Sequence, residues 1–239
     1  FVTGELRGGI GLTEPDAGTD LQGIRTRAVR DGDDYVINGT KTWITNSIEG
    51  TCFALLTKTD INADPPRQGM SMFIVEKGEG FSISKRLEKL GYKGIDSGEM
   101  VFEDFRVPAE NLIGGEEGQG FYQAVGGLEL GRINVASRSV GIAKRALDEA
   151  VRYSQERSTF GKPIYKHQAI QLKLAEMATR YEASRLLVEQ AAKAYDEGRR
   201  CDLEAGMAKY HASESAIENS LEAMRIHGGY GYSKEFIVE

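Results

Sequence analysis

The chain has 239 residues, of which 40% are hydrophobic and 28% charged, a composition typical of a globular protein with one or two domains. Its 30 Lys and Arg against 36 Asp and Glu give a net charge of −6, so no overall positive field favours a nucleic-acid partner. The best apolar run, 53–56, is far too short to span a membrane.

Cysteine and histidine usage argues against disulfide and metal chemistry. Cys52 and Cys201 lie far apart and cannot form the disulfide framework of a small secreted domain. We therefore expect a reducing compartment, the cytoplasm of a bacterium or the mitochondrial matrix of a eukaryote. We expect no metal site, because none of the zinc-binding spacings occurs at the histidines, which are His167, His211 and His227.

Residues 1–115 are predicted to form a β domain. Short β-branched or aromatic runs alternate there with turn residues such as Asn38-Gly39 and Pro65-Pro66. Because no helical stretch separates these runs, we expect mostly antiparallel strands in a barrel or sandwich. The expected strands are 24–29, 35–37, 42–45, 52–57, 70–75, 81–84 and 100–107.

Residues 116–239 change to a helical period. Large apolar residues recur at steps of three, four or their multiples, which predicts an apolar stripe along a helix. In the last long segment these residues are Leu203, Met207, Tyr210, Ile217, Leu221 and Met224. In the segment before it they are Ile170, Leu174, Met177 and Tyr181. Breaks at 158–163, Gly198 and Gly228 leave three helices of more than about 20 residues, predicted to form an antiparallel bundle that is incomplete at its end. The fold class is therefore expected to be α+β.

Two stretches of the predicted β domain are candidates for ligand contact. In residues 12–20 Pro15 stiffens the chain and Gly18 allows close approach to the backbone, although an ordinary turn would look similar. Residues 41–46 carry the single tryptophan. A strand would place Trp43 and Thr45 on one face, where they could meet a flat heterocycle, unless Trp43 belongs to the core.

Three stretches of the helical region are candidates as well. Arg157 and Lys162 could bind a diphosphate together with the next helix N-terminus, or could simply be solvated. Glu129 and Arg132 are three residues apart, so they could pair with each other or face a cavity and a ligand. The paired glycines in 225–232 could end a helix or let the backbone approach a cofactor.

The order and spacing of five stretches resemble the acyl-CoA dehydrogenase family over essentially the whole chain. The stretches are LTEPDAGTD, INGTKTWITN, VFEDFRVPAENLIG, ERSTFGKPIYKHQAIQLKLAEM and RIHGGYGYSKE. Family members are flavoproteins with an N-terminal helical domain, a middle β domain and a C-terminal helical bundle. The resemblance implies that this chain carries the last two domains, as residues 1–115 and 116–239.

The resemblance also implies an FAD site with contributions from both domains. In the β domain the matching positions are Leu12, Thr13, Gly18, Thr19, Trp43, Ile44 and Thr45. Thr45 is the residue expected near flavin N5. In the helical domain three positions are expected to reach the FAD of a neighbouring subunit: Arg157, Phe160 and Gln168. Of these, Arg157 should contact the pyrophosphate. The segment that should approach that same cofactor contains Arg225, Gly228 and Gly229. Many relatives carry glutamine at the position of Arg225.

The implied reaction is α,β-desaturation of an acyl-CoA thioester. A glutamate removes the α proton while a hydride leaves the β carbon for the flavin, and hydrogen bonds to the thioester carbonyl stabilise the enolate. The stretch 128–132 is most similar to short-chain members. The positions matching acyl-CoA contacts are Thr19, Ile95, Glu129 and Arg132. At the position of Ile95 some relatives carry a serine.

The glutamate that acts as the base is not matched within these residues. In most relatives it lies in a Tyr-Glu-Gly-Thr stretch just beyond position 239, and in a minority at the position of Gly131. Glu129 should point to a different helical face from Gly131. Because the chain begins at Phe1 and ends in a half-apolar pattern, we expect a longer polypeptide whose following segment supplies the base.

The resemblance further implies partners and leaves alternatives open. We expect a homodimer or homotetramer that oxidises acyl-CoA in fatty-acid β-oxidation and passes electrons to an electron-transfer flavoprotein. One alternative is an acyl-CoA oxidase-like or nitroalkane oxidase-like enzyme that reduces oxygen. Another is a non-catalytic homologue that binds FAD or CoA.

Overall fold

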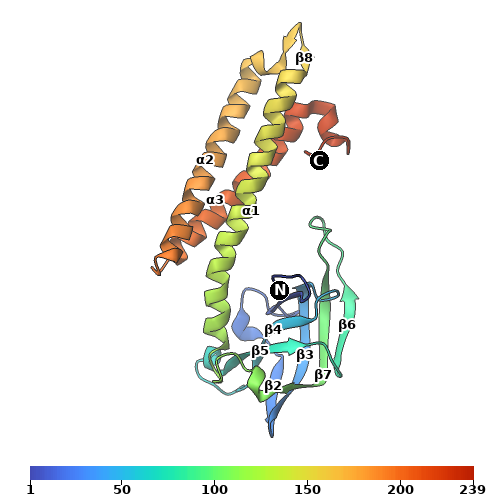
Figure 1. Ribbon diagram of the computed structural model, residues 1–239, viewed down its shortest axis with the longest axis vertical. Coiled ribbons are helices and arrows are strands. Elements are labelled where there is room, and N and C mark those ends of the chain that lie inside the picture. The colour runs from blue at the N-terminus through green and yellow to red at the C-terminus, as the bar shows by residue number, and fades with distance from the viewer. The chain divides into compact units, whose positions relative to one another are not determined.

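The computed structural model describes all 239 residues, which divide into two compact units, Phe1–Gly126 and Gly127–Glu239 (Figure 1). The first unit is a β half-barrel and the second a bundle of three helices. The predicted α+β class, with a β domain followed by a helical bundle, is therefore confirmed.

The first unit is built on one 7-stranded sheet. Its strands are β1 (Gly8–Gly11), β2 (Arg27–Asp31), β3 (Asp34–Thr45), β4 (Cys52–Lys58), β5 (Met70–Glu76), β6 (Phe81–Arg86) and β7 (Ser97–Pro108). The spatial order is β1-β4-β2-β3-β7-β6, with β5 paired to β4. Most pairs are antiparallel, as predicted, whereas β4 pairs in parallel with β1 and, over one residue, with β2.

The prediction of a turn at Asn38-Gly39 is wrong. Both residues lie inside the 12-residue strand β3, which joins the two strands expected at 35–37 and 42–45. The pairing with β7 shifts register between Ile37 and Gly39, and the Asp104 N–H donates to Asn38 Oδ1 at 2.8 Å. The pair therefore forms a β-bulge, in which the asparagine side chain bonds the neighbouring strand rather than its own turn.

The core of the sheet is formed by alternating inward residues of its strands. Tyr35 of β3 and Phe73 of β5 meet edge to face with ring centroids 4.8 Å apart. The largest buried members of this cluster are Tyr35, Ile37, Ile44, Phe53, Leu55, Phe73, Met100, Phe102 and Phe105. Strands β3 and β4 thus contribute several of the buried side chains of this core.

The second unit contains nearly all of three long helices. These helices are α1 (Gly120–Glu156), which begins in the first unit, α2 (Gln168–Asp196) and α3 (Asp202–His227). A two-stranded ribbon, β8 (Ser158–Thr159) with β9 (Lys162–Pro163), connects α1 to α2, and the 3₁₀ turn η5 (Gly228–Tyr232) follows α3. The expected number of helices, their lengths above 20 residues and their breaks are confirmed. None of them carries an apolar stretch long enough to cross a bilayer.

Helix α3 carries the expected apolar stripe, and this stripe lies on its exposed face. Its large residues Leu203, Tyr210 and Ile217 are exposed, while the face toward α1 and α2 is lined by small residues. The buried residues of α3 are Ala205, Ala208, Ala212, Ser215, Ala216, Asn219, Ala223, Ile226 and His227. Small side chains let helices approach closely. Because alanine is also apolar, both the alanine-lined face and the face with the large residues show a helical apolar period, so the period does not tell which of them is buried.

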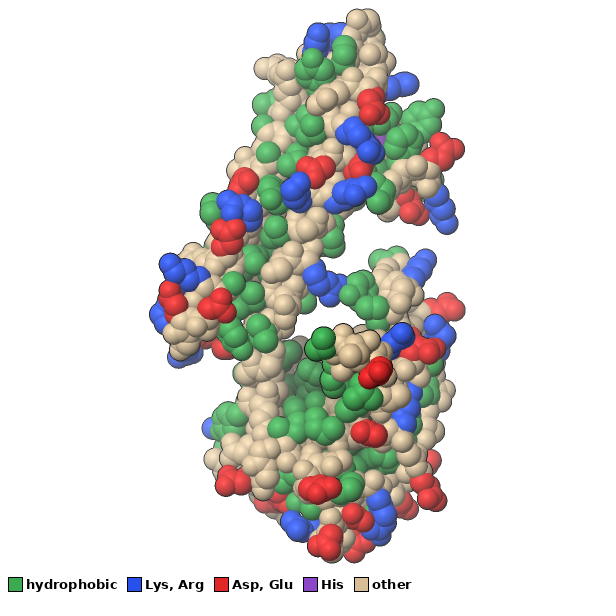
Figure 2. All heavy atoms as spheres, viewed as in Figure 1, with side chains coloured by type: hydrophobic (Ala, Val, Ile, Leu, Met, Phe, Trp, Pro, Cys, Tyr) green, Lys and Arg blue, Asp and Glu red, His purple; other side chains and the backbone are tan.

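Charged side chains of both signs cover the visible face of each unit (Figure 2). Many of them form ion pairs one helical turn apart, such as Lys144 with Asp148 and Arg185 with Glu189. On this face positive and negative side chains are interspersed.

Candidate functional site

Two segments expected to line the flavin lie side by side in the first unit. The Thr42 N–H donates to the Thr13 carbonyl oxygen at 2.9 Å, which joins β3 to the loop after β1. The Lys41 ammonium donates to the Leu12 carbonyl oxygen at 3.0 Å and lies 2.8 Å from Glu14 Oε1. The structure thus brings the stretches 12–19 and 41–46, which are distant in sequence, to one edge of the sheet.

Lys41 and Glu14 form a buried charge pair at this edge. Burial lowers the pKa of Lys41 to about 8, although the Glu14 carboxylate opposes the shift. Burial alone would raise the pKa of Glu14, but the charge and hydrogen bond of Lys41, with hydrogen bonds from Thr26 and Arg25, lower it. Both groups are therefore charged at neutral pH.

Trp43 and Thr45 project outward from β3, whereas Ile44 points into the core. The pairing with β7 shifts register between Lys41 and Ile44, and Trp43 adopts a φ of 60°. Trp43 is consequently 57% exposed and Ile44 only 2%. Trp43 is not a core residue, and Ile44 offers a ligand its backbone alone.

Gly18 and Thr19 lie at the exposed end of the loop that begins at Leu12. No atom lies within 4 Å of the position where a Cβ on Gly18 would stand. The surrounding protein therefore does not require glycine there, which leaves room for a ligand to approach the backbone. Leu12 and Thr13 are half-buried at the other end of the same loop.

Ile95 lies in the segment between β6 and β7. It is half-buried, and its carbonyl oxygen accepts a hydrogen bond from the Lys89 ammonium. It lines a surface pocket of about 350 Å³ together with Arg86, Lys89 and Lys93. Of the residues matched to acyl-CoA contacts, Thr19 and Ile95 thus belong to the first unit.

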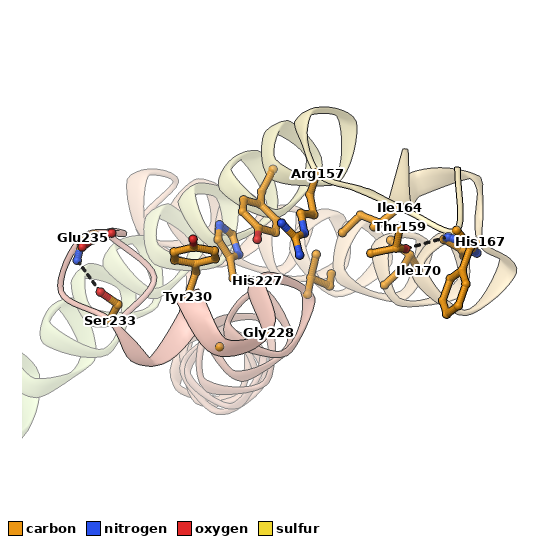
Figure 3. A pocket seen from close by; sticks show the side chains of 14 residues that line it. Arg157, Thr159, Ile164, His167, Ile170, His227, Gly228, Tyr230, Ser233 and Glu235 are labelled. Atoms are coloured by element: carbon orange, nitrogen blue, oxygen red, sulfur yellow. Dashed lines mark hydrogen bonds between the residues drawn. The ribbon is translucent and has the colours of Figure 1, made fainter. Parts of the chain in front are cut away.

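A cavity of about 750 Å³ in the second unit lies among the end of α1, the ribbon β8–β9, the start of α2 and η5. Figure 3 shows Arg157, His227 and Tyr230 around one part of it and Thr159, His167 and Ile170 around another. The residues expected to contact FAD that line this pocket are Arg157, Phe160, Gly228 and Gly229.

Arg157 supplies a guanidinium to the lining of this pocket, and Glu235 supplies a carboxylate. No carboxylate lies within ion-pair distance of its guanidinium, unlike those of Arg145, Arg152 and Arg180. Phe160 is 95% exposed and has a φ of 50° at the tip of the ribbon. An unpaired arginine beside an exposed aromatic ring suits a ligand that carries both a phosphate and an aromatic group.

His227 forms the buried wall of the same pocket. Its Nδ1 lies 2.7 Å from the Ala223 carbonyl oxygen, and because a carbonyl can only accept, Nδ1 carries the proton. Its ring stacks on Tyr153 with centroids 4.1 Å apart. Its Nε2 atom makes no hydrogen bond to Ala223 and is the second polar atom of the ring.

Four predicted contact residues of the second unit lie outside this pocket. Gln168 is exposed at the first position of α2, next to the pocket residue His167, and the Arg225 guanidinium pairs with Glu222 on α3. Glu129 and Arg132 lie on α1 in the second unit, and no ion pair joins them. Mutual pairing, the simplest explanation for their spacing, is therefore absent.

The two arrangements fit different parts of FAD. The exposed Trp43, the Thr45 hydroxyl and the open backbone at Gly18 suit a flat heterocycle. The mostly apolar pocket with Arg157 and glycine backbone suits a diphosphate with an attached aromatic base.

Sequence reasoning missed the residues that support the site from inside. Lys41 and Glu14 were part of quoted stretches, but nothing in the local sequence distinguishes a buried lysine from a solvated one. His227 and Tyr153 lie 74 positions apart, and only the packing of α3 against α1 brings their rings together.

Two family models match the chain, one for each part of the fold. The acyl-CoA dehydrogenase middle domain matches residues 9–105, and the acyl-CoA dehydrogenase C-terminal domain matches residues 118–239.

Similar proteins cover the whole chain. It is 43% identical over 240 residues to an acyl-CoA dehydrogenase of Bacillus subtilis (strain 168), matching 100% of this chain and 62% of that protein. It is 44% identical over 240 residues to the caffeyl-CoA reductase-Etf complex subunit CarC of Acetobacterium woodii, again with 100% and 62% covered. The chain thus spans about three fifths of the length of the curated relatives it matches.

Solved structures share the same fold. Butyryl-CoA dehydrogenase from Megasphaera elsdenii superposes with a TM-score of 0.92 at 44% identity, covering 97% of this chain and 60% of that one. The structure of PigA with FAD and proline superposes with a TM-score of 0.94 at 30% identity, covering 99% and 61%.

Proposed function

The chain belongs to the acyl-CoA dehydrogenase family, and we propose that it is the flavin- and thioester-binding part of an FAD-dependent dehydrogenase that desaturates an acyl-CoA between its α and β carbons. The observation that carries this proposal is the junction of the loop 12–19 with β3, from which Trp43 and Thr45 project. Family homologues use FAD, and one similar structure contains it.

The residues of the chain would bind and orient both groups. When bound, FAD accepts the hydride that leaves the β carbon. The open backbone around Gly18 and the outward side chains of Trp43 and Thr45 would hold the isoalloxazine ring. Arg157, with Gly228 and Gly229, would hold the diphosphate of an FAD, and we propose that this FAD belongs to a neighbouring subunit.

Abstraction of the α proton requires a carboxylate. Gly131 supplies none, and Glu129 lies near Arg200 and Cys201. We do not assign the base to Glu129, because its spacing from Gly131 places it on a different face of α1. We propose instead a glutamate of the longer protein.

Among acyl-CoA substrates we propose a short chain. The support is the similarity of the stretch 128–132 to short-chain members and the 44% identity to butyryl-CoA dehydrogenase. The proposed acceptor is an electron-transfer flavoprotein, because a relative at 44% identity is a subunit of an Etf complex.

We also propose that the protein associates with copies of itself. The exposed stripe on α3 repeats every seven residues at Leu203, Tyr210 and Ile217, and Met207 and Leu221, which are 14 residues apart, lie on the same face. Such a repeat is typical of a helix that packs against another helix. The stripe lies on the side of α3 opposite to its alanine-lined face, so the three-helix bundle itself does not cover it.

The test is the visible absorption spectrum of the full-length purified protein, recorded anaerobically before and after addition of butyryl-CoA, octanoyl-CoA and a branched acyl-CoA. Bleaching of an oxidised flavin band, strongest with butyryl-CoA, is the expected result. Reoxidation by electron-transfer flavoprotein rather than by oxygen would support the acceptor, whereas rapid peroxide formation would favour an oxidase.

Two results would contradict the dehydrogenase proposal. A bound flavin that none of the thioesters bleaches would favour a non-catalytic FAD- or CoA-binding homologue. A full-length protein that binds no FAD at all would overturn the assignment of the cofactor.

A further inference from the structure

A lysine and a glutamate are buried together beneath the expected flavin-binding surface. The Lys41 side chain is 0% exposed and that of Glu14 6%. Their charged atoms lie 2.8 Å apart, and the Lys41 ammonium also donates to the Leu12 carbonyl oxygen. Neither side chain reaches the surface, so neither can contact a ligand directly.

Glu14 connects the loop to a third segment. Its Oε2 accepts a hydrogen bond from the Arg25 N–H at 2.6 Å, and its Oε1 accepts one from the Thr26 N–H at 3.0 Å. Its own backbone pairs with Ala17 in both directions, at 2.8 and 3.1 Å. One carboxylate therefore ties the loop 12–17 to the residues just before β2.

Lys41 fixes the other side of the same junction. It is the last inward-pointing residue of β3 before the register shift that ends at Ile44. Within that shift the positive φ of Trp43 turns the indole outward, and Thr45 follows on the same side. The bonds of Lys41 to Leu12 and Glu14 thus hold β3 against the loop at the residue just before the segment that carries these two side chains.

Stability alone does not explain a charge pair in this place. Removing two charges from water is costly, and a buried ion pair is often no more stabilising than apolar residues of similar volume. The lowered pKa of Lys41 reflects the same cost of burial. What apolar side chains cannot reproduce is the set of directional bonds to Leu12, Arg25 and Thr26.

We propose that Lys41 and Glu14 are positioning residues that set the loop 12–19 and the Trp43–Thr45 segment at the mutual spacing required to bind the flavin ring. The inference rests on the proposed function, because it takes that surface to be the flavin site. It predicts that flavin affinity and the flavin spectrum depend on two side chains that never touch the flavin.

The experiment compares variants of the full-length protein, each stripped of FAD and titrated with it. The double variant Lys41→Met/Glu14→Gln removes both charges and leaves an acceptor oxygen for one of the two N–H groups. Its FAD dissociation constant is expected to rise at least about tenfold, with loss of the fine structure of the bound flavin band, while its circular dichroism stays like that of the wild type. The matched control, Lys144→Met/Asp148→Asn, removes an exposed ion pair on α1 and should leave both flavin readouts unchanged.

A subtler variant covers the case in which the double variant does not fold. Glu14→Asp keeps both charges but withdraws the carboxylate by one methylene, so we expect a folded protein with weaker FAD binding and an altered flavin spectrum. Wild-type affinity and spectrum in Glu14→Asp, or in a folded double variant, would overturn the inference. Absence of flavin from the wild type would instead overturn the proposed function.

Discussion

Trp43 is the most informative single residue of the candidate site. A bulky side chain at a φ of 60° is uncommon and costs conformational energy, yet the indole stays exposed instead of filling the core. Such strain indicates that the outward position is needed for something other than packing. Because Trp43 is the single tryptophan, its fluorescence reports directly on this position.

We predict that FAD quenches this fluorescence. The apoprotein should emit like a largely solvated indole, and titration with FAD should quench most of the emission as the flavin band of the complex appears. Fluorescence titration checks this, with Trp43→Phe as the control that removes the signal. A protein whose absorption shows bound flavin while the emission of Trp43 is unchanged would place the flavin elsewhere.

Two glycines of α1 are predicted to respond in opposite ways to alanine. A Cβ on Gly141 meets no atom within 4 Å, whereas one on Gly120 would lie 2.6 Å from the Ser71 backbone. Gly141→Ala should therefore raise the free energy of unfolding by about 0.5–1 kcal/mol through helix propensity. Gly120→Ala should lower it by about 1–3 kcal/mol through the clash. Urea unfolding followed by circular dichroism measures both, and equal effects of the two changes would contradict the argument.

The quoted sequence stretches predicted the outward residues of the site better than its support. Trp43 and Thr45 were expected to share a face, and both are exposed. Ile44 was expected to contact the cofactor in the same way as its neighbours, but the bulge buries its side chain. The Lys41–Glu14 pair joins residues 27 positions apart, and local patterns contain no information on such a contact.

At the scale of elements, the sequence predicts the type of structure more reliably than its orientation. The helical period of 202–227 is correct, but the large apolar residues face outward and the alanines inward. A periodic pattern gives two candidate faces when small residues recur opposite large ones, and only packing decides between them. In β3 an Asn-Gly pair that favours turns is overridden by pairing on both sides with β2 and β7.

The contact between α2 and α3 includes a charged group whose pKa is shifted. Glu222 of α3 bonds Lys173 of α2 and Arg225 of its own helix. Burial alone would raise the pKa of Glu222, but hydrogen bonds and charge from Lys173 and Arg225 lower it below its ordinary value of 4.5. The carboxylate therefore stabilises the fold above pH 4.5, and the contribution is lost as the pH falls through the lowered pKa.

We predict that Glu222→Gln lowers the free energy of unfolding by about 1 kcal/mol at pH 7. The difference in free energy of unfolding between variant and wild type should stay constant down to about pH 5. It should shrink at lower pH as the wild-type carboxylate becomes protonated. Urea unfolding at a series of pH values measures it. Glu189→Gln, which breaks an exposed pair on α2, is the control and should change stability by less than about 0.5 kcal/mol. A pH-independent cost for Glu222→Gln would refute the electrostatic explanation.

At the scale of the molecule, each of the two compact units carries its own candidate ligand-binding arrangement. The β unit carries the loop 12–19 and the outward residues of β3, and the helical unit carries the Arg157 pocket. The order of these parts was predictable from the order of the sequence stretches. The exposure of the α3 stripe was not, because a helical period alone does not tell which face of a helix is buried.

The stripe leads to a prediction about association. Burying one large apolar side chain stabilises an interface by about 1.5–3 kcal/mol, so losing two weakens self-association at least about 100-fold. The double variant Tyr210→Asp/Ile217→Asp of the full-length protein should therefore have a lower mass in solution than the wild type. Both residues are more than half exposed, at 69% and 58%, so the change should leave the bundle folded.

Light scattering coupled to size-exclusion chromatography measures the mass, and circular dichroism verifies the fold. Lys209→Asp adds an acidic residue to the same helix beside the stripe, and it should leave the mass unchanged. A wild type that is monomeric at micromolar concentration, or a folded double variant with the wild-type mass, would show that copies of this chain do not meet through α3. A loss of mass in the double variant alone would identify the stripe as the self-association surface, because the two variants differ mainly in where they place the acidic groups on the same helix.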